Sequence, residues 1–423
     1  MSQVAVVGAG YVGLTTGACL ARIGHNVVCG DVVPAKVALL SSGQIPIVEA
    51  GLEDLVCEGL GAGRLSFVVG ARTAVEGAEF VFLCVPTPQD EDGSADLSYI
   101  QAASQEIGPH LKPGSVVINK STVPVGSTLI VERALRRPDV SVVSNPEFLR
   151  EGSAVHDFLH PDRIVVGNGT LGACERVATL YEKLDAPVVV TDAASAEMIK
   201  YASNAFLATK ISFANAISNI CEAVGADAEE VIKGMGLDHR IGFEFLQPGP
   251  GWGGSCFPKD TRAMVKIAEE AGYDFSLLRG VVQVNEEQQA RVVKKIQRMA
   301  GGPLNGAVIA AWGLTFKAGT DDIRESPALA IIRRLLAKGA EVQAYDPGHT
   351  KPVDGVTSCA NAYDAARDAD VTVVLTDWPQ FADIDLARVR ELMRAPRIVD
   401  ARNLLDPDEA RAQGFEYASL GRR

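Results

Sequence analysis

The sequence predicts an α/β protein in which two doubly wound domains are joined by a long central helix and a helical middle domain. Short apolar runs alternate with helical patterns up to residue 192 and again after residue 300, as in parallel sheets flanked by helices. Between these regions, the run from Ala193 continues for about thirty residues without Pro or internal Gly and predicts a helix of roughly 45 Å. We therefore predict domains at 1–192, 193–300 and 301–423.

Each expected strand is a short run rich in Val and Ile that is bounded by turn residues. In the first domain the strands are expected at 4–7, 26–31, 79–85, 115–119, 140–144 and 164–167. Helical patterns continue after the central helix to about Met299, and Gly301, Gly302 and Pro303 then mark a break. In the last domain the strands are expected at 307–314, 341–346, 371–376 and 397–401.

Composition limits the class of protein and its partners. With 423 residues, 47% of them hydrophobic, the chain is long enough for two or three domains with large cores. The net charge of −13 argues against nucleic acid or an anionic membrane as partner, so an anionic substrate would need local Lys and Arg residues. The six His residues are scattered without ligand spacing, and no bound metal is expected.

The cysteines and the N-terminus indicate a cytoplasmic protein. The eight cysteines form no CxxC pair and are scattered through apparent strands and helices, which is typical of a reducing compartment. The chain runs into its first strand without a basic leader, and no apolar run approaches the ~20 residues that span a bilayer.

A glycine motif follows the first strand and predicts a dinucleotide site. Gly8, Gly10 and Gly13 in GAGYVG stand between strand 4–7 and a helical run, the order found in Rossmann-like domains. The first glycine permits a tight turn, the second lets the backbone reach a pyrophosphate, and the third allows close helix packing. Asp31 ends the next strand, where an acid bonds a ribose 2′-hydroxyl and repels a 2′-phosphate, so NAD is favoured over NADP. The alternative is a glycine turn that binds nothing.

A second glycine-rich segment, PGPGWGGSCFPKD at 248–260, surrounds one thiol, Cys256. Pro258 suits the opening of a helix, so the thiol should lie just before a helix N-terminus and near Lys259. Both features favour the thiolate, the form that attacks a carbonyl carbon. The alternative, a structural thiol in a core, is less consistent with a glycine-rich loop.

Further polar residues complete a candidate site. Lys200 and Asn204 are four apart in the central helix, so they share one face and could hold a substrate hydroxyl and a developing alkoxide. Thr122, Glu147 and Glu151 lie in loops after strands, at the edge where open α/β sheets bind ligands. Taken alone, Lys200 could be a solvated surface lysine and the two Glu residues ordinary caps.

Together these segments identify the chain as similar to the UDP-glucose/GDP-mannose dehydrogenase family, nucleotide-sugar dehydrogenases that oxidise a sugar alcohol to a carboxylate. The matching segments, in order, are VVGAGYVG, VPTP, STVPVG, NPEFLREG, EMIKYASNAF, HRIG, PGPGWGGSCFPKD, GLTFKAGTDDIRESPA and DARNLL. The resemblance implies a four-electron oxidation of UDP-glucose to UDP-glucuronate with two NAD⁺, through a Cys thiohemiacetal and thioester. It also implies an N-terminal NAD domain, a central helix used in a homodimer, and a C-terminal UDP-binding domain.

The resemblance assigns roles by position. It implies catalytic roles for Cys256, Asp260, Lys200, Asn204, Thr122, Glu147 and Glu151, with either Glu serving thioester hydrolysis. It implies NAD contacts at Gly8, Gly10, Tyr11, Val12, Gly13, Asp31, Lys36, Thr87, Thr122, Glu151, Lys259 and Arg324. It implies nucleotide-sugar contacts at Glu147, Phe148, Leu149, Lys200, Asn204, Arg240, Phe245, Gly249, Gly253, Cys256, Lys317 and Arg402, with Arg240 reaching across from a second subunit.

The chemistry agrees with the resemblance. A primary alcohol loses two hydrides to become an acid, and a thiol that captures the intermediate aldehyde holds it for the second oxidation. Three alternatives remain open at this point. The substrate could be GDP-mannose or a UDP-N-acetylhexosamine; the enzyme could be a two-electron hydroxyacid dehydrogenase, which would have no use for Cys256; or the chain could be an NAD-binding regulator without activity.

Overall fold

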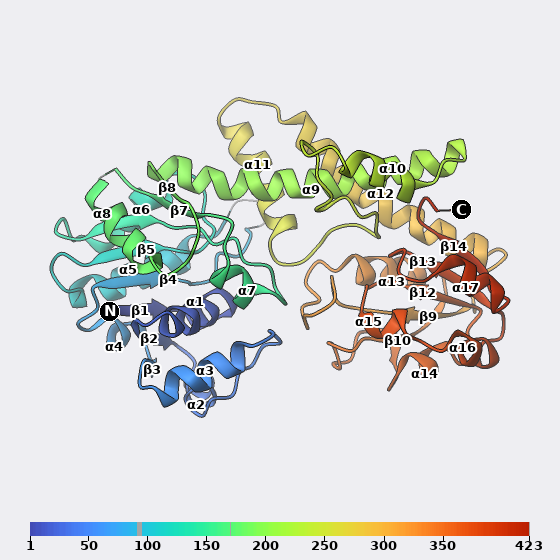
Figure 1. Cartoon of the computed structure of the whole chain (residues 1–423), viewed down its shortest axis with the longest axis horizontal. Coiled ribbons are helices and arrows are strands. Elements are labelled where there is room, and N and C mark those ends of the chain that lie inside the picture. The colour runs from blue at the N-terminus through green and yellow to red at the C-terminus, as the bar shows by residue number, and fades with distance from the viewer. Residues whose placement is uncertain (91–94, 170, 423) are drawn as a thin grey trace. The chain divides into compact units, whose positions relative to one another are not determined.

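The computed structural model describes residues 1–90, 95–169 and 171–422 and divides into two compact units, each treated by itself (Figure 1). Unit 1 contains Met1–Ser203 and Arg262–Ala271, and unit 2 contains Asn204–Thr261 and the chain from Gly272 onward. Residues 91–94 and 170 of the predicted N-terminal domain, and residue 423 of the predicted C-terminal domain, lie outside the described part.

Unit 1 is built on an eight-stranded sheet with the order β3-β2-β1-β4-β5-β6-β7-β8. Its strands are β1 (Gln3–Val7), β2 (Asn26–Asp31), β3 (Leu65–Val69), β4 (Phe80–Leu83), β5 (Val116–Asn119), β6 (Ser141–Ser144), β7 (Ile164–Gly167) and β8 (Val188–Thr191). Strand order reverses between β1 and β4, which is the position where doubly wound sheets bind ligands. The sequence-predicted strands are all present.

Helices cover both faces of this sheet, because alternate residues of each strand are buried on opposite sides. Val4 and Val6 of β1 belong to one apolar cluster, whereas Ala5 and Val7 belong to another. The first cluster includes residues of α1 (Tyr11–Arg22), α2 (Pro34–Ser41), α3 (Leu52–Gly61), α7 (Ala154–Leu159), α8 (Leu171–Ala178) and the 3₁₀ turn η2 (Thr179–Tyr181). The second includes α4 (Ala71–Val75), α5 (Ser98–Ile107), which leads into η1 (Gly108–His110), and α6 (Ser127–Leu135).

One strand pair departs from the expected parallel sheet. Strands β6 and β7 are antiparallel and pair only at Ser144 and Gly167. Because these two residues end their strands, the rest of β7 extends beyond the carboxyl end of β6. The connection at 145–163 therefore remains at the carboxyl edge of the sheet. Strand β7 contacts the first residue of this connection, because the Asn145 amide donates to the Val165 carbonyl. A sequence pattern of apolar runs does not report strand direction, so this reversal was not foreseen.

The central helix α9 (Ala193–Val224) begins where the sequence predicts and has 32 residues, about 48 Å of helix. It begins in unit 1 and continues into unit 2. The helices α10 (Ala228–Gly236), α11 (Phe257–Glu270) and α12 (Ser276–Met299) follow. Among the described residues, no helix has both the length and the apolar character needed to cross a bilayer.

Unit 2 contains a second sheet, entirely parallel, with the order β11-β10-β9-β12-β13-β14. Its strands are β9 (Val308–Trp312), β10 (Glu341–Tyr345), β11 (Val356–Ser358), β12 (Val371–Val374), β13 (Arg397–Asp400) and β14 (Glu416–Ser419). One face packs against α12 and α13 (Pro327–Ala337). The other packs against α14 (Ala362–Ala366), α15 (Pro379–Ala382), α16 (Leu386–Leu392) and α17 (Pro407–Ala412). The predicted second doubly wound domain is confirmed.

The two sheets repeat one turn as well as one strand order. After β1, the Gly8 N–H donates to the Gly30 carbonyl at 2.8 Å, and after β9 the Gly313 N–H donates to the Tyr345 carbonyl at 2.9 Å. The next N–H in each turn donates to the aspartate at the end of the neighbouring strand, Asp31 in unit 1 and Asp346 in unit 2. Both domains thus begin with the same strand-turn-strand geometry.

Candidate active site

The turn after β1 has the geometry that the glycine motif predicts. A Cβ on Gly13 would lie 1.8 Å from the Gly8 carbonyl oxygen, so only glycine lets α1 approach the turn this closely. No heavy atom lies within 4 Å of the place where a Cβ on Gly10 would stand. Gly10 is the N-cap of α1 and supplies no side-chain cap to the first N–H groups of the helix, which lack partners within the helix. The turn fits a pyrophosphate.

Asp31 is held at the end of β2 by three donors. Its carboxylate accepts from the backbone N–H groups of Ala9 at 3.1 Å and Val33 at 3.0 Å, and from the Lys36 ammonium at 2.7 Å. Burial opposes ionisation of this group, but Lys36 and the backbone donors hold its pKa below the ordinary value. The predicted cofactor residues Asp31 and Lys36 therefore form one ion pair beside the glycine turn.

Tyr11 begins α1 and belongs to a buried polar cluster. Its hydroxyl contacts the carboxylate of Glu49, a residue that is only 6% exposed. The Gly152 N–H donates to both groups, at 3.0 Å to Tyr11 and 2.7 Å to Glu49. Burial, and then the bond to Glu49, raise the pKa of Tyr11 well above its ordinary value. This cluster connects the glycine motif to the loop that carries Glu151. Sequence reasoning missed Glu49, because no local pattern marks its long-range partners.

The loop after β5 carries Thr122 and is fixed at both ends. The Thr87 hydroxyl donates to the Thr122 carbonyl at 2.9 Å, so these two predicted site residues meet. At the other end of the loop, Glu197 of α9 is 3% exposed and accepts from the N–H groups of Gly126 and Thr128. The Glu197 carboxylate caps α6 and ties the loop to the helix that carries Lys200.

Glu147 and Lys200 form a buried ion pair. The Lys200 Nζ lies 3.0 Å from the Glu147 Oε1, and each side chain is 5% exposed. Glu147 also accepts from the Leu149 N–H at 2.6 Å, and the Lys200 ammonium lies 5.5 Å from the centre of the Phe148 ring. Burial favours the protonated carboxyl, but the Lys200 charge prevails and lowers the pKa of Glu147. Four predicted residues are thus brought together, and Glu147 is an ionised carboxylate.

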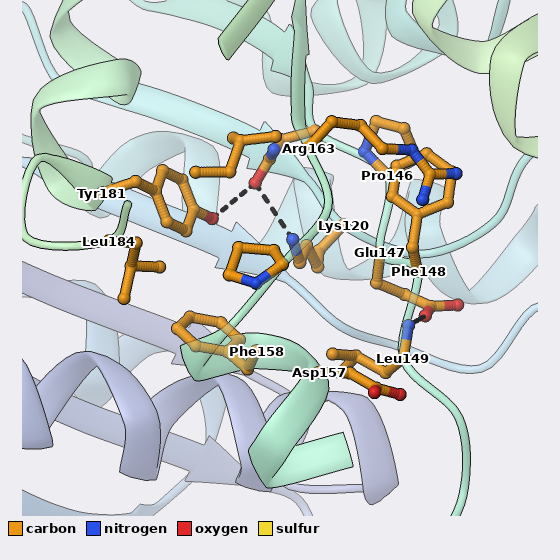
Figure 2. Close-up of a pocket in the computed structure, with 13 residues that line it drawn as sticks. Lys120, Pro146, Glu147, Phe148, Leu149, Asp157, Phe158, Arg163, Tyr181 and Leu184 are labelled. Carbon is orange, nitrogen blue, oxygen red and sulfur yellow. Dashed lines mark hydrogen bonds between the residues drawn. The ribbon is translucent and has the colours of Figure 1, made fainter. Parts of the chain in front are cut away.

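A cavity of about 40 Å³ adjoins this pair, and Lys120, Asn145, Glu147 and Tyr181 are among its lining residues (Figure 2). The Lys120 Nζ donates to the Asn145 Oδ1 at 3.1 Å, and the Tyr181 hydroxyl donates to the same oxygen at 2.6 Å. Sequence reasoning missed Lys120, although it directly precedes the STVPVG segment and follows a buried strand, which is an unusual place for a lysine.

In unit 2, Cys256 directly precedes α11, as predicted. The Asp260 N–H donates to the Cys256 carbonyl at 2.8 Å, which closes the first turn of the helix. The Asp260 carboxylate is fully buried and accepts from Lys259 at 2.8 Å and from the Asn204 amide at 2.6 Å. Cys256 and Asp260 therefore lie at the same end of α11, where Asn204 of α9 is bonded to Asp260.

The glycine loop before Cys256 is held by polar side chains of two helices. The Gly249 N–H donates to Asn215 at 2.8 Å, and the Trp252 indole donates to Ser212 at 2.9 Å, both on α9. Asn285 of α12 both accepts from the Trp252 N–H and donates to the Trp252 carbonyl. Because Asn204, Ser212 and Asn215 share one helical face, α9 positions the whole segment. Sequence reasoning missed Ser212, Asn215 and Asn285.

The loop glycines also have a packing reason that was not foreseen. A Cβ on Gly253 would lie 2.1 Å from the Glu325 carbonyl oxygen and 2.8 Å from the Pro327 ring. The Gly254 N–H donates to the Arg324 carbonyl at 3.1 Å. Close backbone contact within unit 2, rather than ligand approach alone, therefore requires glycine here.

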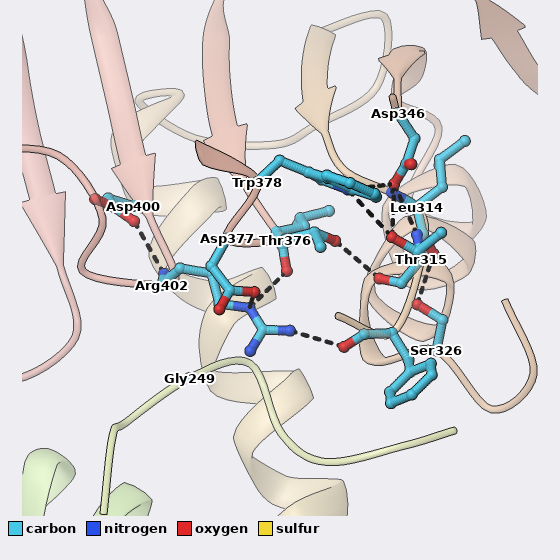
Figure 3. A network of polar contacts seen from close by, with 12 residues as sticks. Gly249, Leu314, Thr315, Ser326, Asp346, Thr376, Asp377, Trp378, Asp400 and Arg402 are labelled. Carbon is cyan, nitrogen blue, oxygen red and sulfur yellow. Dashed lines mark hydrogen bonds and ion pairs between the residues drawn. The ribbon is translucent and has the colours of Figure 1, made fainter. Parts of the chain in front are cut away.

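Arg402 lies at the carboxyl edge of the second sheet (Figure 3). Its guanidinium donates to the carbonyls of Leu375 at 2.9 Å and Phe316 at 3.0 Å. The Lys317 ammonium lies 5.6 Å from the centre of the Phe316 ring, so both predicted cationic residues flank one loop. A Cβ on Gly249 would come within 3.4 Å of Arg402, which brings a third predicted substrate residue to the same place.

Four other predicted residues have contacts of their own. Arg240, with its side chain 78% exposed, pairs with Asp238 at 2.6 Å, and Arg324 pairs in the same way with Asp322. Phe245 has a φ of 63° and its ring lies 6.2 Å from that of Phe257, near the start of α11. Val12, the second residue of α1, packs against the first apolar cluster of unit 1.

Comparison with known proteins decides the family. The three domains of the UDP-glucose/GDP-mannose dehydrogenase family match in order: the NAD binding domain at residues 2–185, the central domain at 194–287 and the UDP binding domain at 310–407. The chain belongs to this family. As a member of the UDP-glucose/GDP-mannose dehydrogenase family, it is an NAD-dependent oxidoreductase with a nucleotide sugar as substrate.

Relatives match this family member over almost the whole chain. It is 46% identical to the UDP-glucose 6-dehydrogenase of Rhizobium meliloti, with 99% of each chain covered. It is 47% identical to a UDP-glucose 6-dehydrogenase of Bacillus subtilis, covering 100% of this chain and 98% of the other. A solved UDP-glucose dehydrogenase from Pyrobaculum islandicum is similar with a TM-score of 0.93 at 38% identity, covering 100% and 98%.

Proposed function

We propose that this protein oxidises UDP-glucose to UDP-glucuronate with two NAD⁺, through a thioester on Cys256. The observation that carries the proposal is the Cys256 thiol at the N-terminal end of α11, next to the buried Asp260 that Asn204 and Lys259 hold. A helix N-terminus favours an anionic sulfur, and a dehydrogenase of simple alcohols would not need one. The full-length similarity to proteins named UDP-glucose 6-dehydrogenase supports the choice of substrate.

The chemistry balances over three stages. The sugar CH₂OH loses a proton and a hydride to become an aldehyde, and the Cys256 sulfur adds to it as a thiohemiacetal. Loss of a second proton and hydride gives the thioester, which water cleaves to the carboxylate and the thiol. Bound NAD⁺ supplies the acceptor for each hydride. In total, UDP-glucose, two NAD⁺ and one water give UDP-glucuronate, two NADH and three protons.

The chain's own groups hold the charges that develop. Lys200 and Asn204, one turn apart on α9, would donate to the substrate oxygen as it becomes negative, with Thr122 assisting. Asp260 would accept and return protons for Cys256, because its carboxylate begins one turn into the helix that Cys256 opens.

We assign thioester hydrolysis to Glu147 rather than Glu151. Glu147 is buried, ionised and bonded to Lys200 at 3.0 Å, so its carboxylate belongs to the substrate-side group. Glu151 instead adjoins Gly152, whose N–H is bonded to Tyr11 of the glycine motif, which supports a role beside NAD. An ionised carboxylate is the form that can take a proton from the attacking water.

We infer that the remaining predicted residues bind the ligands. Gly8, Gly10, Gly13, Asp31 and Lys36 would hold NAD, and the open space at Gly10 supports this. Gly249, Lys317 and Arg402 would hold the nucleotide sugar, since they flank one loop of the second sheet. The domain boundaries 1–192, 193–300 and 301–423 stand as our proposal, and the three family segments fall within them.

The stoichiometry tests the function. We expect two NADH for each UDP-glucose consumed and UDP-glucuronate as product, because the thiol keeps the aldehyde on the enzyme for the second oxidation. NADH absorbance, with chromatography of the nucleotide sugars, measures both. One NADH with free aldehyde would contradict the proposal. A panel with GDP-mannose and UDP-N-acetylhexosamines tests the alternative substrates.

We further propose a homodimer formed through α9. Phe206, Phe213 and Ile220 are 65%, 49% and 56% exposed and are spaced seven residues apart, so they form one apolar stripe in unit 2. A hollow of about 380 Å³ between α9 and α12 continues this stripe at Ile220 and Val284. A long apolar stripe on a helix is typical of a surface that another copy covers.

If the stripe on α9 forms the dimer, a substitution within it should lower the mass of the protein in solution. Phe213→Glu should weaken association about tenfold or more, because it would bury an unpaired charge at the interface. Light scattering after gel filtration measures the mass, and Tyr99→Glu, at an exposed apolar site on α5, is the control. A wild-type monomer would overturn the proposal. We also propose a cytoplasmic location, supported by the eight cysteines, which form no disulfide in the described structure, and checked by cell fractionation.

A further inference from the structure

Lys120 is a buried cation for which neither the family resemblance nor the proposed mechanism has a role. It follows β5 and is 6% exposed. Its ammonium donates to the side-chain oxygen of Asn145, and it lies 5.8 Å from the centre of the Tyr181 ring. A buried ammonium bonded to a neutral amide costs free energy unless a negative charge lies near it.

The charges that face Lys120 come from several elements. Glu147, in the loop after β6, favours its charged form, whereas Lys200 of α9 opposes it. The Cys84 thiol after β4 is also near, but burial raises its pKa to about 12, so it is neutral near pH 7. Asp157 of α7 and Arg163 before β7 line the same cavity. Burial outweighs the attraction of Glu147 and lowers the pKa of Lys120 to about 8. Near neutral pH, two ammonium groups therefore stabilise the negative charge of Glu147. Lys200 is bonded to its carboxylate, and Lys120 acts through its charge.

Lys120 also fixes the start of the loop that carries Glu147. The Asn145 oxygen accepts from Lys120 and Tyr181, its amide donates to the Val165 carbonyl at 2.7 Å, and its backbone N–H donates to the Asn119 carbonyl at 3.0 Å. Asn145 is thus anchored through both its side chain and its backbone. Glu147 follows two residues later, so the position of its carboxylate depends on this anchor.

We propose that Lys120 is a positioning residue for thioester hydrolysis, which anchors Asn145 at the start of the Glu147 loop and supplies a second positive charge near the Glu147 carboxylate. The proposal rests on the proposed function, in which Glu147 activates the water. Lys200 has to serve the substrate oxygen during the oxidations, and a second cation maintains the charge of Glu147 while Lys200 is so engaged. In this role Lys120 acts through its bond to Asn145 and through its charge on Glu147, and not on the substrate itself.

The test separates the charge of Lys120 from its hydrogen bond. Lys120→Met removes both, Lys120→Gln removes the charge and can still donate to Asn145, and Tyr181→Phe removes one bond to Asn145 without a change of charge. Without the cation, the pKa of Glu147 rises, so the base becomes ionised only at higher pH. We expect both Lys120 variants to move the acid limb of the kcat profile upward by about one pH unit, and Tyr181→Phe to leave it in place.

Intact-mass spectrometry gives a second readout. Below the displaced limb, the Lys120 variants should release two NADH per site in a normal burst and then accumulate the thioester on Cys256. Thermal unfolding of each variant reports whether it is folded. If Lys120→Met does not fold, Lys120→Gln alone provides the test.

An unchanged acid limb in both Lys120 variants, or an equal displacement in Tyr181→Phe, would overturn the inference. Failure of the proposed function is distinguishable, because the wild-type enzyme would then show neither the two-NADH burst nor an adduct on Cys256. A wild-type burst and adduct with unaffected Lys120 variants would reject the role of Lys120 alone.

Discussion

Replacing Cys256 with Ser should lower UDP-glucuronate formation by about three orders of magnitude or more, while UDP-glucose and NAD still bind. A serine hydroxyl is a much weaker acid and nucleophile than a thiol, so capture of the aldehyde would fail. The substitution should preserve the loop, because Asn215, Asn285 and Ser212 hold it through residues other than Cys256. Steady-state turnover beside calorimetric binding of both ligands measures the effect.

The control for this substitution is Cys57→Ser, at an exposed thiol on α3. It should retain full activity, which would show that loss at Cys256 does not reflect a general need for thiols. Near-normal acid formation by Cys256→Ser would rule out covalent catalysis and return the thiol to a structural role. An ester adduct at residue 256 in the variant would show that the chemistry continues slowly on the serine oxygen.

Replacing Lys200 with Ala should lower the rate of the first NADH release by about three orders of magnitude. The ammonium is the only charged donor among the groups that we propose for the substrate oxygen, and a neutral side chain cannot stabilise an alkoxide. Single-turnover NADH formation measures this step directly. Lys233→Ala, which removes an exposed lysine of α10, is the matched control.

Loss of stability accompanies Lys200→Ala and has to be separated from loss of chemistry. Breaking a buried ion pair strands Glu147 as an unpaired charge, which costs about 3–5 kcal/mol of unfolding free energy. The double variant Lys200→Met with Glu147→Gln removes both charges and should recover most of that loss, while NADH release stays slow. Recovery of activity with stability would mean that Lys200 acts only in the fold.

The sequence predicts the fold well where the signal is local. The apolar run of β1, the glycines behind it and the start of α9 at Ala193 each depend on residues close together in the chain, and the structure confirms them. The direction of β7 depends on how a connection packs, which no residue type encodes. The antiparallel pairing at Ser144 and Gly167 could therefore only be found from the structure.

The candidate site divides in the same way. Lys200 and Asn204 are separated by one helical turn, so their common face could be predicted. Their partners Glu147 and Asp260 lie 53 and 56 residues away in sequence, and only the fold brings each pair together. Lys120 and Glu49 were missed for a related reason, because Lys and Glu are mostly surface residues and nothing local indicates that these two are buried.

The same turn occurs in both sheets, but the aspartates that it contacts differ in how many further hydrogen bonds they can accept. A carboxylate has about four lone-pair positions. Asp31 receives three donors, from Ala9, Val33 and Lys36, and so keeps acceptor capacity for a sugar hydroxyl. Asp346 receives six, from the backbone of Leu314, Thr315, Gly348 and His349, the Thr315 hydroxyl and the Trp378 indole. Donors within the protein use the acceptor positions of Asp346. The second domain therefore has the fold of a dinucleotide-binding domain, but its aspartate has no acceptor position left for a ribose hydroxyl.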